Sequence, residues 1–325
     1  MKIAKIPCAP AAASVDMRMQ PAARQWQWLA GLGRGRRMSR RRLLRCLSHL
    51  VADTETADVD LDRLLVTDPA APLTKEQIDH FMLEGYVALP GLIPVSFNTA
   101  LKADVDALMA DRASNSARLI ASYGTLGELC SYPPVVDKVR QLMKEYGNGE
   151  TECGMHHIHA NRQAPGTGSS NWHQDYHSAA NTYLREQLMV HVFYYLDGLD
   201  GTIGDLMILP RSQYAHWDGG SMQAIFGDRA LPGSKTFGTG TAVPQGTAVI
   251  CHSALVHGRR KRPGGSFRYF ADVSYCQPGE RQWPNDMQRK EEERALAAAK
   301  GLDHAGKYDS IWNSESPSIY TIQYQ

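Results

Sequence analysis

The sequence has no large excess of charge and no long apolar run, and both absences narrow what the protein can be. Its 325 residues carry 35 Lys and Arg against 34 Asp and Glu, a formal net charge of +1. A nucleic-acid-binding domain usually has a basic excess, so this balance argues against nucleic acid as a partner. No stretch approaches the roughly 20 apolar residues that a membrane span needs. We expect one large globular domain, or at most two.

The 6 cysteines also lack a pattern, because none of them forms a CxxC pair. Structural zinc sites usually have cysteines at short CxxC-type spacings, and disulfide frameworks are typical of short, cysteine-dense secreted chains. We therefore interpret the cysteines as reduced thiols and expect a cytoplasmic protein. No apolar segment of about 7–15 residues follows the first lysines, so the sequence does not indicate a secretory signal.

Positive charge is nevertheless concentrated at the start, where the first 50 residues hold one acid, Asp16. An Arg-rich, acid-poor start is typical of a mitochondrial transit peptide, and a basic arm can also bind nucleic acid or an acidic membrane. We favour a leader that takes no part in the fold. We divide the chain into a basic, weakly structured extension (1–70), a functional domain (71–280), and a C-terminal helix and tail packing on that domain (281–325).

The folded part is expected to begin with a helix after Leu73. Thr74 and Gln77 have the spacing of a capping box, and Gly85 is expected to end the helix before a short strand at Tyr86–Pro90. Further helices are predicted at Ser96–Ala110, 134–146 and Asp286–Lys300.

Beyond about residue 150, short apolar runs are separated by Gly, Pro, Asn and Asp. Several short strands separated in this way are typical of an antiparallel barrel or jelly roll. We therefore predict a mainly β fold with flanking helices. The predicted strands are Leu188–Leu196, Leu206–Leu209, Ala248–His252 and Phe267–Tyr275.

Two histidines and one aspartate have the character of a metal site. His173 and Asp175 flank Gln174 just before a predicted strand, and His257 follows several strands later. Two imidazoles and a carboxylate can hold one face of an octahedral Fe(II) ion and leave the other face open for a co-substrate and O2. Arg268, shortly beyond, can grip a co-substrate carboxylate with two hydrogen bonds. These residues predict an oxygen-activating enzyme.

The His-x-Asp pattern is not specific by itself, because it recurs at His216 and Asp218. That copy follows a loop-like segment, precedes two glycines and has no strong strand after it. We therefore interpret it as a surface loop and place the metal at His173, Asp175 and His257.

Four stretches between Leu73 and Gln277 together resemble the phytanoyl-CoA dioxygenase family of Fe(II)/2-oxoglutarate oxygenases. The combination is specific, although each motif alone is not. The stretches are Leu73–Gln77 with Glu84–Val87 and Leu89–Gly91, then Trp172–Asp175, then Gly204–Ser212, and finally Gly246–His252 with His257, Gly258 and Arg268.

The resemblance implies a double-stranded β-helix, a cupin-like jelly roll, that uses Fe²⁺, 2-oxoglutarate and O2. His173, Asp175 and His257 match the iron ligands. Arg268 matches the residue that binds the C5 carboxylate of 2-oxoglutarate, and Gln174 matches a position that can also touch this co-substrate.

Two positions depart from the pattern of the relatives. Arg259 stands where many relatives carry Ser or Thr, so a hydroxyl contact to the co-substrate is in doubt. Arg211–Gln213 stands where relatives often carry Gly-Ser-His. Neither departure touches the metal ligands.

The expected reaction hydroxylates an aliphatic carbon of a small molecule and releases succinate and CO2. Asp175 argues against a halogenase, which needs that coordination position vacant. Desaturation or ring closure by the same oxidant stays open. The alternatives are a cupin-like metal enzyme that does not use 2-oxoglutarate and would not need Arg268, and an inactive relative with a binding role.

Six further residues are candidates for contacts to the substrate or to the metal ligands. Alternation along a strand puts two of them, His157 and His159, on one face and His156 on the other. These histidines could line the pocket, form a polar strand edge or bind a second metal. The six candidates are His157, His159, His177, Arg185, His191 and His252.

His191 is expected either to face the co-substrate or to be a core histidine, and His252 is expected behind the ligands rather than among them. The basic turn Arg259–Arg262 is either a solvated hairpin or an attraction for an anionic substrate, such as a carboxylate, phosphate or CoA thioester. The sequence selects neither a substrate nor an oligomeric state.

Overall fold

The structure is a computed structural model that describes residues 57–58, 68–114, 116, 118–146, 151–166, 170–175, 188–202, 204–214, 231, 233–238, 242–260, 267–277 and 290–313. Its helices are α3 (Lys75–Glu84), α4 (Val95–Ala113), α5 (Gly124–Cys130), α6 (Pro133–Tyr146), α9 (Lys290–Ala299) and α10 (Asp309–Trp312), with 3-10 turns η2 (Ile120–Ser122) and η3 (Ser212–Tyr214).

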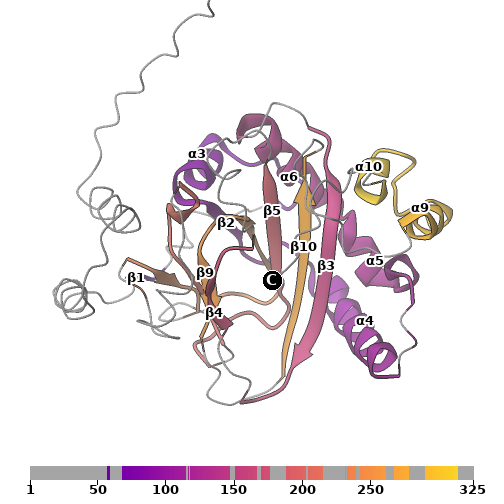
Figure 1. The fold of residues 1–325 in the computed structure, drawn as a ribbon, viewed down its shortest axis with the longest axis horizontal. Helices are drawn as coiled ribbons and strands as arrows, with labels where there is room; N and C mark the ends of the chain where they lie inside the picture. Colours follow the sequence, from indigo (N-terminus) through magenta and orange to yellow (C-terminus); the bar gives the residue numbers. More distant parts are fainter. Residues whose placement is uncertain are drawn as a thin grey trace, which may run out of the picture.

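Two β-sheets form the centre of the molecule (Figure 1). The first sheet contains, in spatial order, β2 (Tyr86–Leu89), β8 (Thr247–His252), β5 (Met189–Tyr195), β10 (Arg268–Cys276) and β3 (Gly154–Gln163). The second contains β1 (Ala57–Asp58), β7 (Lys235–Thr236), β6 (Leu206–Ile208), β9 (His257–Arg259) and β4 (Ser170–His173). The described strand pairs are antiparallel apart from the two-residue pair of β1 with β7.

The start of α3 confirms the predicted capping box. Thr74 Oγ1 accepts a hydrogen bond from the Gln77 N–H, and Gln77 Oε1 accepts one from the Thr74 N–H at 2.9 Å. The helix ends at Gly85, whose φ of 88° is the left-handed conformation that glycine adopts without strain. The chain then enters β2, whose four residues are all buried.

The four strands predicted in the second half are confirmed as β5, β6, β8 and β10, with ends that differ by at most one residue. Alternation along β10 puts Arg268, Phe270, Asp272 and Ser274 on one face of the sheet. This face looks toward the second sheet, and we call it the inner face.

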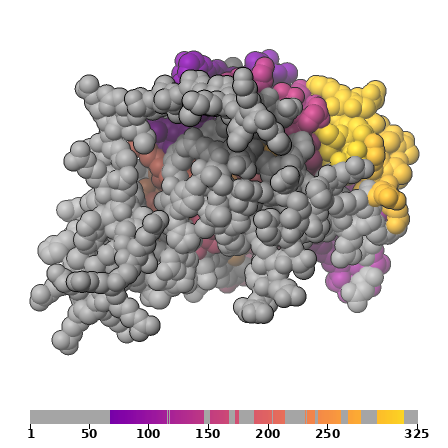
Figure 2. Space-filling model, turned by 45° about the horizontal axis from the view of Figure 1, so that its top comes forward, coloured from indigo at the N-terminus to yellow at the C-terminus, as the bar shows by residue number. Residues whose placement is uncertain are grey.

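The outer face of the first sheet packs against helices. The Tyr269 hydroxyl donates to Asp106 of α4 at 2.9 Å, and the Tyr275 hydroxyl donates to the Cys130 carbonyl of α5 at 2.9 Å. Helices α4, α5, α9 and α10 lie on the β3 side of the molecule (Figure 1), and the last two form the yellow group at its edge in Figure 2. The helices therefore leave the space between the sheets for the inner-face side chains.

Ala57–Asp58, within the predicted extension, forms β1. The four cysteines of the described residues, at 130, 153, 251 and 276, are free and buried, and Cys8 and Cys46 lie outside those residues. Among the helices that the structure describes, none is long and apolar enough to cross a membrane.

Candidate metal centre

The predicted ligands His173, Asp175 and His257 meet at one edge of the second sheet. His173 ends β4, His257 begins β9, and the two residues are directly paired across these strands. The distance from Asp175 Oδ1 to His173 Nε2 is 3.4 Å, and that from Asp175 Oδ2 to His257 Nε2 is also 3.4 Å. Metal–ligand bonds of about 2.0–2.2 Å place neighbouring donor atoms roughly 3.0–3.5 Å apart. The three side chains therefore have the spacing of a metal site.

Local hydrogen bonds hold His257 and the loop before it in place. His257 Nδ1 donates to the Leu255 carbonyl at 3.0 Å, which leaves Nε2 directed at Asp175. Gln174, between the two other ligands, donates its amide to the Ala254 carbonyl at 2.6 Å. Ser212 Oγ accepts from the Val256 N–H at 2.7 Å. The loop before His257 is thus hydrogen-bonded both to the segment after β4 and to η3.

The charge states suit a metal. Burial alone would raise the pKa of Asp175, but the neighbouring His191, His257 and His173 outweigh it and hold the pKa well below its usual range. Burial lowers the pKa of His257 to about 4. The carboxylate is therefore ionised and the His257 imidazole neutral near neutral pH, as metal ligands must be.

A buried guanidinium and aromatic rings extend from this centre along the first sheet. Arg268 is 4% exposed, and its Nη1 donates to the Gly204 carbonyl. The guanidinium carbon lies 5.4 Å from the centroid of the Phe270 ring. The centroid of Phe193 lies 5.2 Å from that of His257 and 5.9 Å from that of Phe270. Phe193 and Phe270 therefore connect the candidate metal centre with Arg268.

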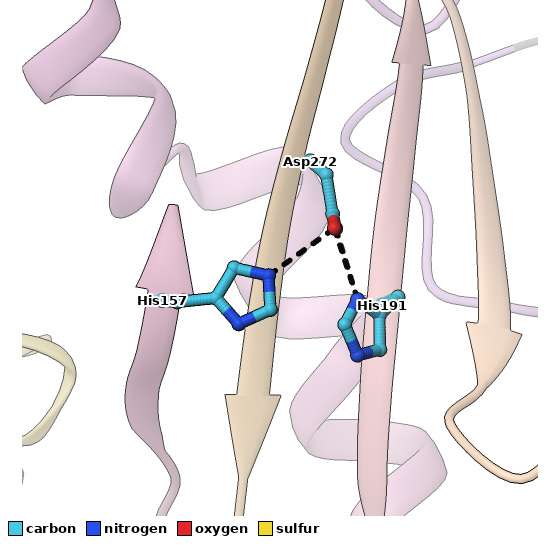
Figure 3. A group of neighbouring side chains, drawn as sticks. All are labelled: His157, His191 and Asp272. Atoms are coloured by element: carbon cyan, nitrogen blue, oxygen red, sulfur yellow. Dashed lines mark hydrogen bonds and ion pairs between the residues drawn. The ribbon is translucent and has the colours of Figure 1, made fainter. Parts of the chain in front are cut away.

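Figure 3 shows a second group of possible ligands, which includes a residue that was not predicted from the sequence, Asp272. Asp272 of β10 lies between two imidazoles. Its Oδ2 is 3.3 Å from His157 Nε2 of β3 and 3.0 Å from His191 Nδ1 of β5. His191 Nδ1 is also 3.6 Å from Asp175 Oδ2. The two groups are therefore adjacent.

Asp272 and His191 of this second group carry opposite charges. Burial disfavours the charged form of each side chain, but the attraction between the two charges outweighs burial. This attraction lowers the pKa of Asp272 to about 2, and the charges of Asp272 and Asp175 together raise the pKa of His191 to about 9. His191 is 2% exposed, and its Nε2 has no hydrogen-bond partner among the described residues. His191 is thus a buried histidine, which was one of the two alternatives expected from the sequence, and it also lies beside the candidate centre.

Asp272 carried a usable signal in the sequence. It lies four residues after Arg268 in a predicted strand, so alternation alone puts both side chains on the same face. What the sequence lacked was the register that brings β3 and β5 to either side of Asp272.

The prediction that His156 faces away from His157 is wrong. His156 Nδ1 lies 2.9 Å from His157 Nδ1 and 3.2 Å from Ser274 Oγ. The pairing of β3 with β10 shifts register between Ser274 and Tyr275. A bulge of this kind interrupts the alternation on which the prediction relied.

The other candidates are more dispersed. His159 is exposed on β3, with Nε2 3.1 Å from the Asn161 amide. His252 ends β8, and its Nδ1 accepts from the Ala254 N–H at 3.0 Å, within the turn that leads to His257. Arg259 donates through Nη1 to Gln163 Oε1. The candidates His177 and Arg185, and the surface loop predicted at His216 and Asp218, lie outside the described residues.

Comparison with known proteins identifies the family. Residues 81–268, more than half of the chain, match phytanoyl-CoA dioxygenase (PhyH). The chain belongs to this family and is therefore an enzyme of the Fe(II)/2-oxoglutarate-dependent dioxygenases, which use iron and 2-oxoglutarate. No curated protein sequence matches the chain.

Solved structures support the fold. EctD from S. alaskensis, solved with 2-oxoglutarate and 5-hydroxyectoine, matches with a TM-score of 0.50 and 17% identity, over 69% of this chain and 83% of that one. HygX from Streptomyces hygroscopicus, solved with nickel and 2-oxoglutarate, matches with 0.51 and 14%, over 66% and 90%. SnoK, a carbocyclase from nogalamycin biosynthesis, matches with 0.52 and 14%, over 68% and 90%. These likenesses confirm the predicted double-stranded β-helix.

Proposed function

We propose that this dioxygenase binds Fe(II) through His173, Asp175 and His257 and hydroxylates an aliphatic carbon of a small molecule, with release of succinate and CO2. The observation that carries the proposal is the convergence of these three side chains at 3.4 Å spacings. Two imidazoles and one carboxylate are the donor set of oxygen-activating Fe(II) sites with open positions. Iron and 2-oxoglutarate bound there would supply the oxidant.

Arg268 is the proposed anchor for the C5 carboxylate of 2-oxoglutarate. Its guanidinium is buried on the inner face and is connected with His257 by Phe193 and Phe270. A low-polarity wall strengthens the attraction between a guanidinium and a carboxylate and excludes water from it. Gln174 binds the loop before His257 through its amide nitrogen, so any contact with the co-substrate would use its Oε1.

The charge balance supports the same assignment. Fe(II) and Asp175 together leave one positive charge, and dianionic 2-oxoglutarate turns the sum negative. Arg268 restores neutrality, which a buried site needs. A cupin-like metal enzyme without 2-oxoglutarate would have no use for this buried cation.

The finer features remain our proposals. Desaturation or ring closure would start from the same oxidant. Arg259 and Arg260, just after the distal ligand, favour an anionic substrate. A cytoplasmic location, with a mitochondrial one if the basic N-terminus is a transit peptide, stays a prediction.

Succinate formation under O2 tests the function. We expect the protein with Fe(II) and 2-oxoglutarate to form succinate, faster when a screened small molecule is its substrate. His257→Ala should abolish this activity. Arg268→Ala should keep the metal but raise the 2-oxoglutarate concentration for half-saturation by about 10–100-fold, the loss of a hydrogen-bonded charge of ~1.5–3 kcal/mol.

Arg294→Ala is the matched control for Arg268→Ala, because Arg294 forms an exposed ion pair with Asp309 on the C-terminal helices. It should leave half-saturation unchanged. Turnover of a substrate without 2-oxoglutarate, or unchanged 2-oxoglutarate binding in Arg268→Ala, would contradict the proposal.

A further inference from the structure

The register of three neighbouring strands assembles the second histidine–aspartate group. Ser274 of β10 is paired with His157 of β3 on one side and with His191 of β5 on the other. Paired residues point to the same face, so both imidazoles project inward on either side of β10. Asp272, two residues before Ser274, projects from the same face. The sheet therefore brings two imidazoles and a carboxylate together without any loop.

The spacing within this group matches that of the first centre. The donor atoms of His157, His191 and Asp272 all lie within 4.8 Å of one another. The two distances to Asp272 Oδ2 are 3.3 and 3.0 Å, against 3.4 Å for both contacts of Asp175. Both sets are close to the separation of about 3.0–3.5 Å between neighbouring ligands on one ion. In Figure 3, both rings point one nitrogen at the carboxylate.

The surroundings also favour a ligand role for His157. Its other nitrogen, Nδ1, lies 3.0 Å from Ser274 Oγ and 2.9 Å from His156 Nδ1. A metal-bound histidine is usually held in this way through its second nitrogen, which fixes the ring and directs the first nitrogen at the metal.

We propose that His157, His191 and Asp272 bind a second divalent transition-metal ion next to the first centre. Two imidazoles and one carboxylate select ions such as Zn²⁺, Fe²⁺ or Co²⁺ over Mg²⁺ and Ca²⁺, which prefer oxygen ligands. Asp175 Oδ2, 3.6 Å from His191 Nδ1, lies between the two groups and contributes negative charge to both.

Three costs have to be met. The pKa of His191 is raised to about 9, so its imidazole must release a proton before Nδ1 can bind a metal. Binding through Nδ1 leaves the proton of His191 on Nε2, where the described residues offer no acceptor, so a water molecule or a bound small molecule takes that place. Two adjacent dications also carry four positive charges. Asp175 and Asp272 offset two of these, and a dianionic co-substrate would offset the others, so that with Arg268 the whole site would carry one net positive charge; this last balance rests on the proposed function.

Metal stoichiometry tests the inference without substrate, 2-oxoglutarate or O2. The metal-free full chain is titrated anaerobically with Co²⁺ and, separately, with Zn²⁺, and bound metal is counted after equilibrium dialysis. We expect two equivalents for the wild type, one for Asp272→Asn, one for His257→Asn and none for the double variant. In Asp272→Asn, the remaining Co²⁺ should give the ligand-field spectrum of an ion bound by His173, Asp175 and His257.

His157→Gln should also lose one equivalent of metal, and His157 is less buried than Asp272. The test therefore does not depend on whether Asp272→Asn folds. Asp309→Asn, an exposed carboxylate far along the chain, is the control and should keep both ions. One equivalent in the wild type, or a second equivalent that persists in both Asp272→Asn and His157→Gln, would overturn the inference. The group would then be a hydrogen-bonded triad beside Asp175.

Discussion

Asp175 is the residue on which the neighbouring imidazoles converge. One carboxylate oxygen faces His173, and the other faces His257 at 3.4 Å and His191 at 3.6 Å. A single residue thus links the predicted centre with the group that contains Asp272. Its ionised form is stabilised by these neighbours even without a metal, which would preorganise the carboxylate for a cation.

His80 allows a pH prediction away from any metal. Burial lowers its pKa below the usual 6.5, its Nε2 has no partner within the described residues, and its ring packs edge-on against Tyr86 at 4.8 Å. Protonation therefore favours the unfolded chain, and stability is lost as the pH falls below the usual value toward the folded one. His80→Leu should raise the melting temperature relative to wild type more at about pH 5 than at about pH 8.

Thermal unfolding of both proteins at the two pH values measures this difference. The value at the higher pH is the internal control, because both forms of residue 80 are then uncharged. An equal difference at both pH values would contradict the role of His80 protonation.

The residues of the candidate metal centre could be proposed from the sequence because several motifs, none of them specific alone, occur together. His173 and Asp175 are two positions apart, and a recognisable resemblance supplied His257 and Arg268. Alternation puts Asp272 on the same face as Arg268, but the sequence does not give the register that brings two histidines to either side of it. His156 was misplaced for a related reason, because a bulge reverses alternation and leaves no mark in the local sequence.

At the scale of elements, the strands with long apolar runs and four of the six described α-helices were predicted. The apolar runs of β5 and β8 are nearly continuous, because both faces of these strands are buried. Helix α5 was missed, since Gly124 and Gly127 are poor helix formers. Its stability comes from distant residues: the Leu126 N–H donates to Asp104 of α4 at 2.9 Å. Such a long-range contact is not readable from a local pattern.

The turn before β8 depends on a glycine. Gly246 has a φ of 73°, and a Cβ there would lie 2.4 Å from the Ile93 carbonyl oxygen. Gly246→Ala therefore combines backbone strain of about 1–2 kcal/mol with overpacking of about 1–3 kcal/mol. We expect urea unfolding to show a loss of roughly 2–5 kcal/mol, the sum of these terms.

Gly91→Ala is the matched control for Gly246→Ala. Gly91 has a φ of 63°, but nothing lies within 4 Å of the position that a Cβ would take there. This variant should lose only the strain of about 1–2 kcal/mol. Equal losses in the two variants would show that the contact with Ile93 does not matter.

At the scale of the whole molecule, the two sheets divide the site between them. The second sheet and its loop provide His173, Asp175 and His257, and the first sheet provides Arg268 and the group around Asp272. The jelly-roll class was predictable from the spacing of strands and from the resemblance. The pairing of β10 between β3 and β5 was not, because register depends on partners far apart in the sequence.

A buried carboxylate of helix α9 contacts the rest of the domain. Glu293 is 4% exposed and accepts hydrogen bonds from the Ile120 N–H at 2.6 Å and the Ala121 N–H at 2.9 Å, at the start of η2. Glu293→Gln keeps the shape but turns one acceptor into a donor that faces a backbone N–H. Leaving such groups unpaired costs about 1–3 kcal/mol.

We therefore expect Glu293→Gln to lower the unfolding free energy by about that amount and to expose α9 first. Hydrogen exchange of the α9 amides should become faster than exchange in β5 and β8. Glu291→Gln, an exposed position on the same helix, should change neither quantity, because its side chain stays in water. Uniform acceleration across helix and sheet would instead mean that α9 unfolds only together with the β core.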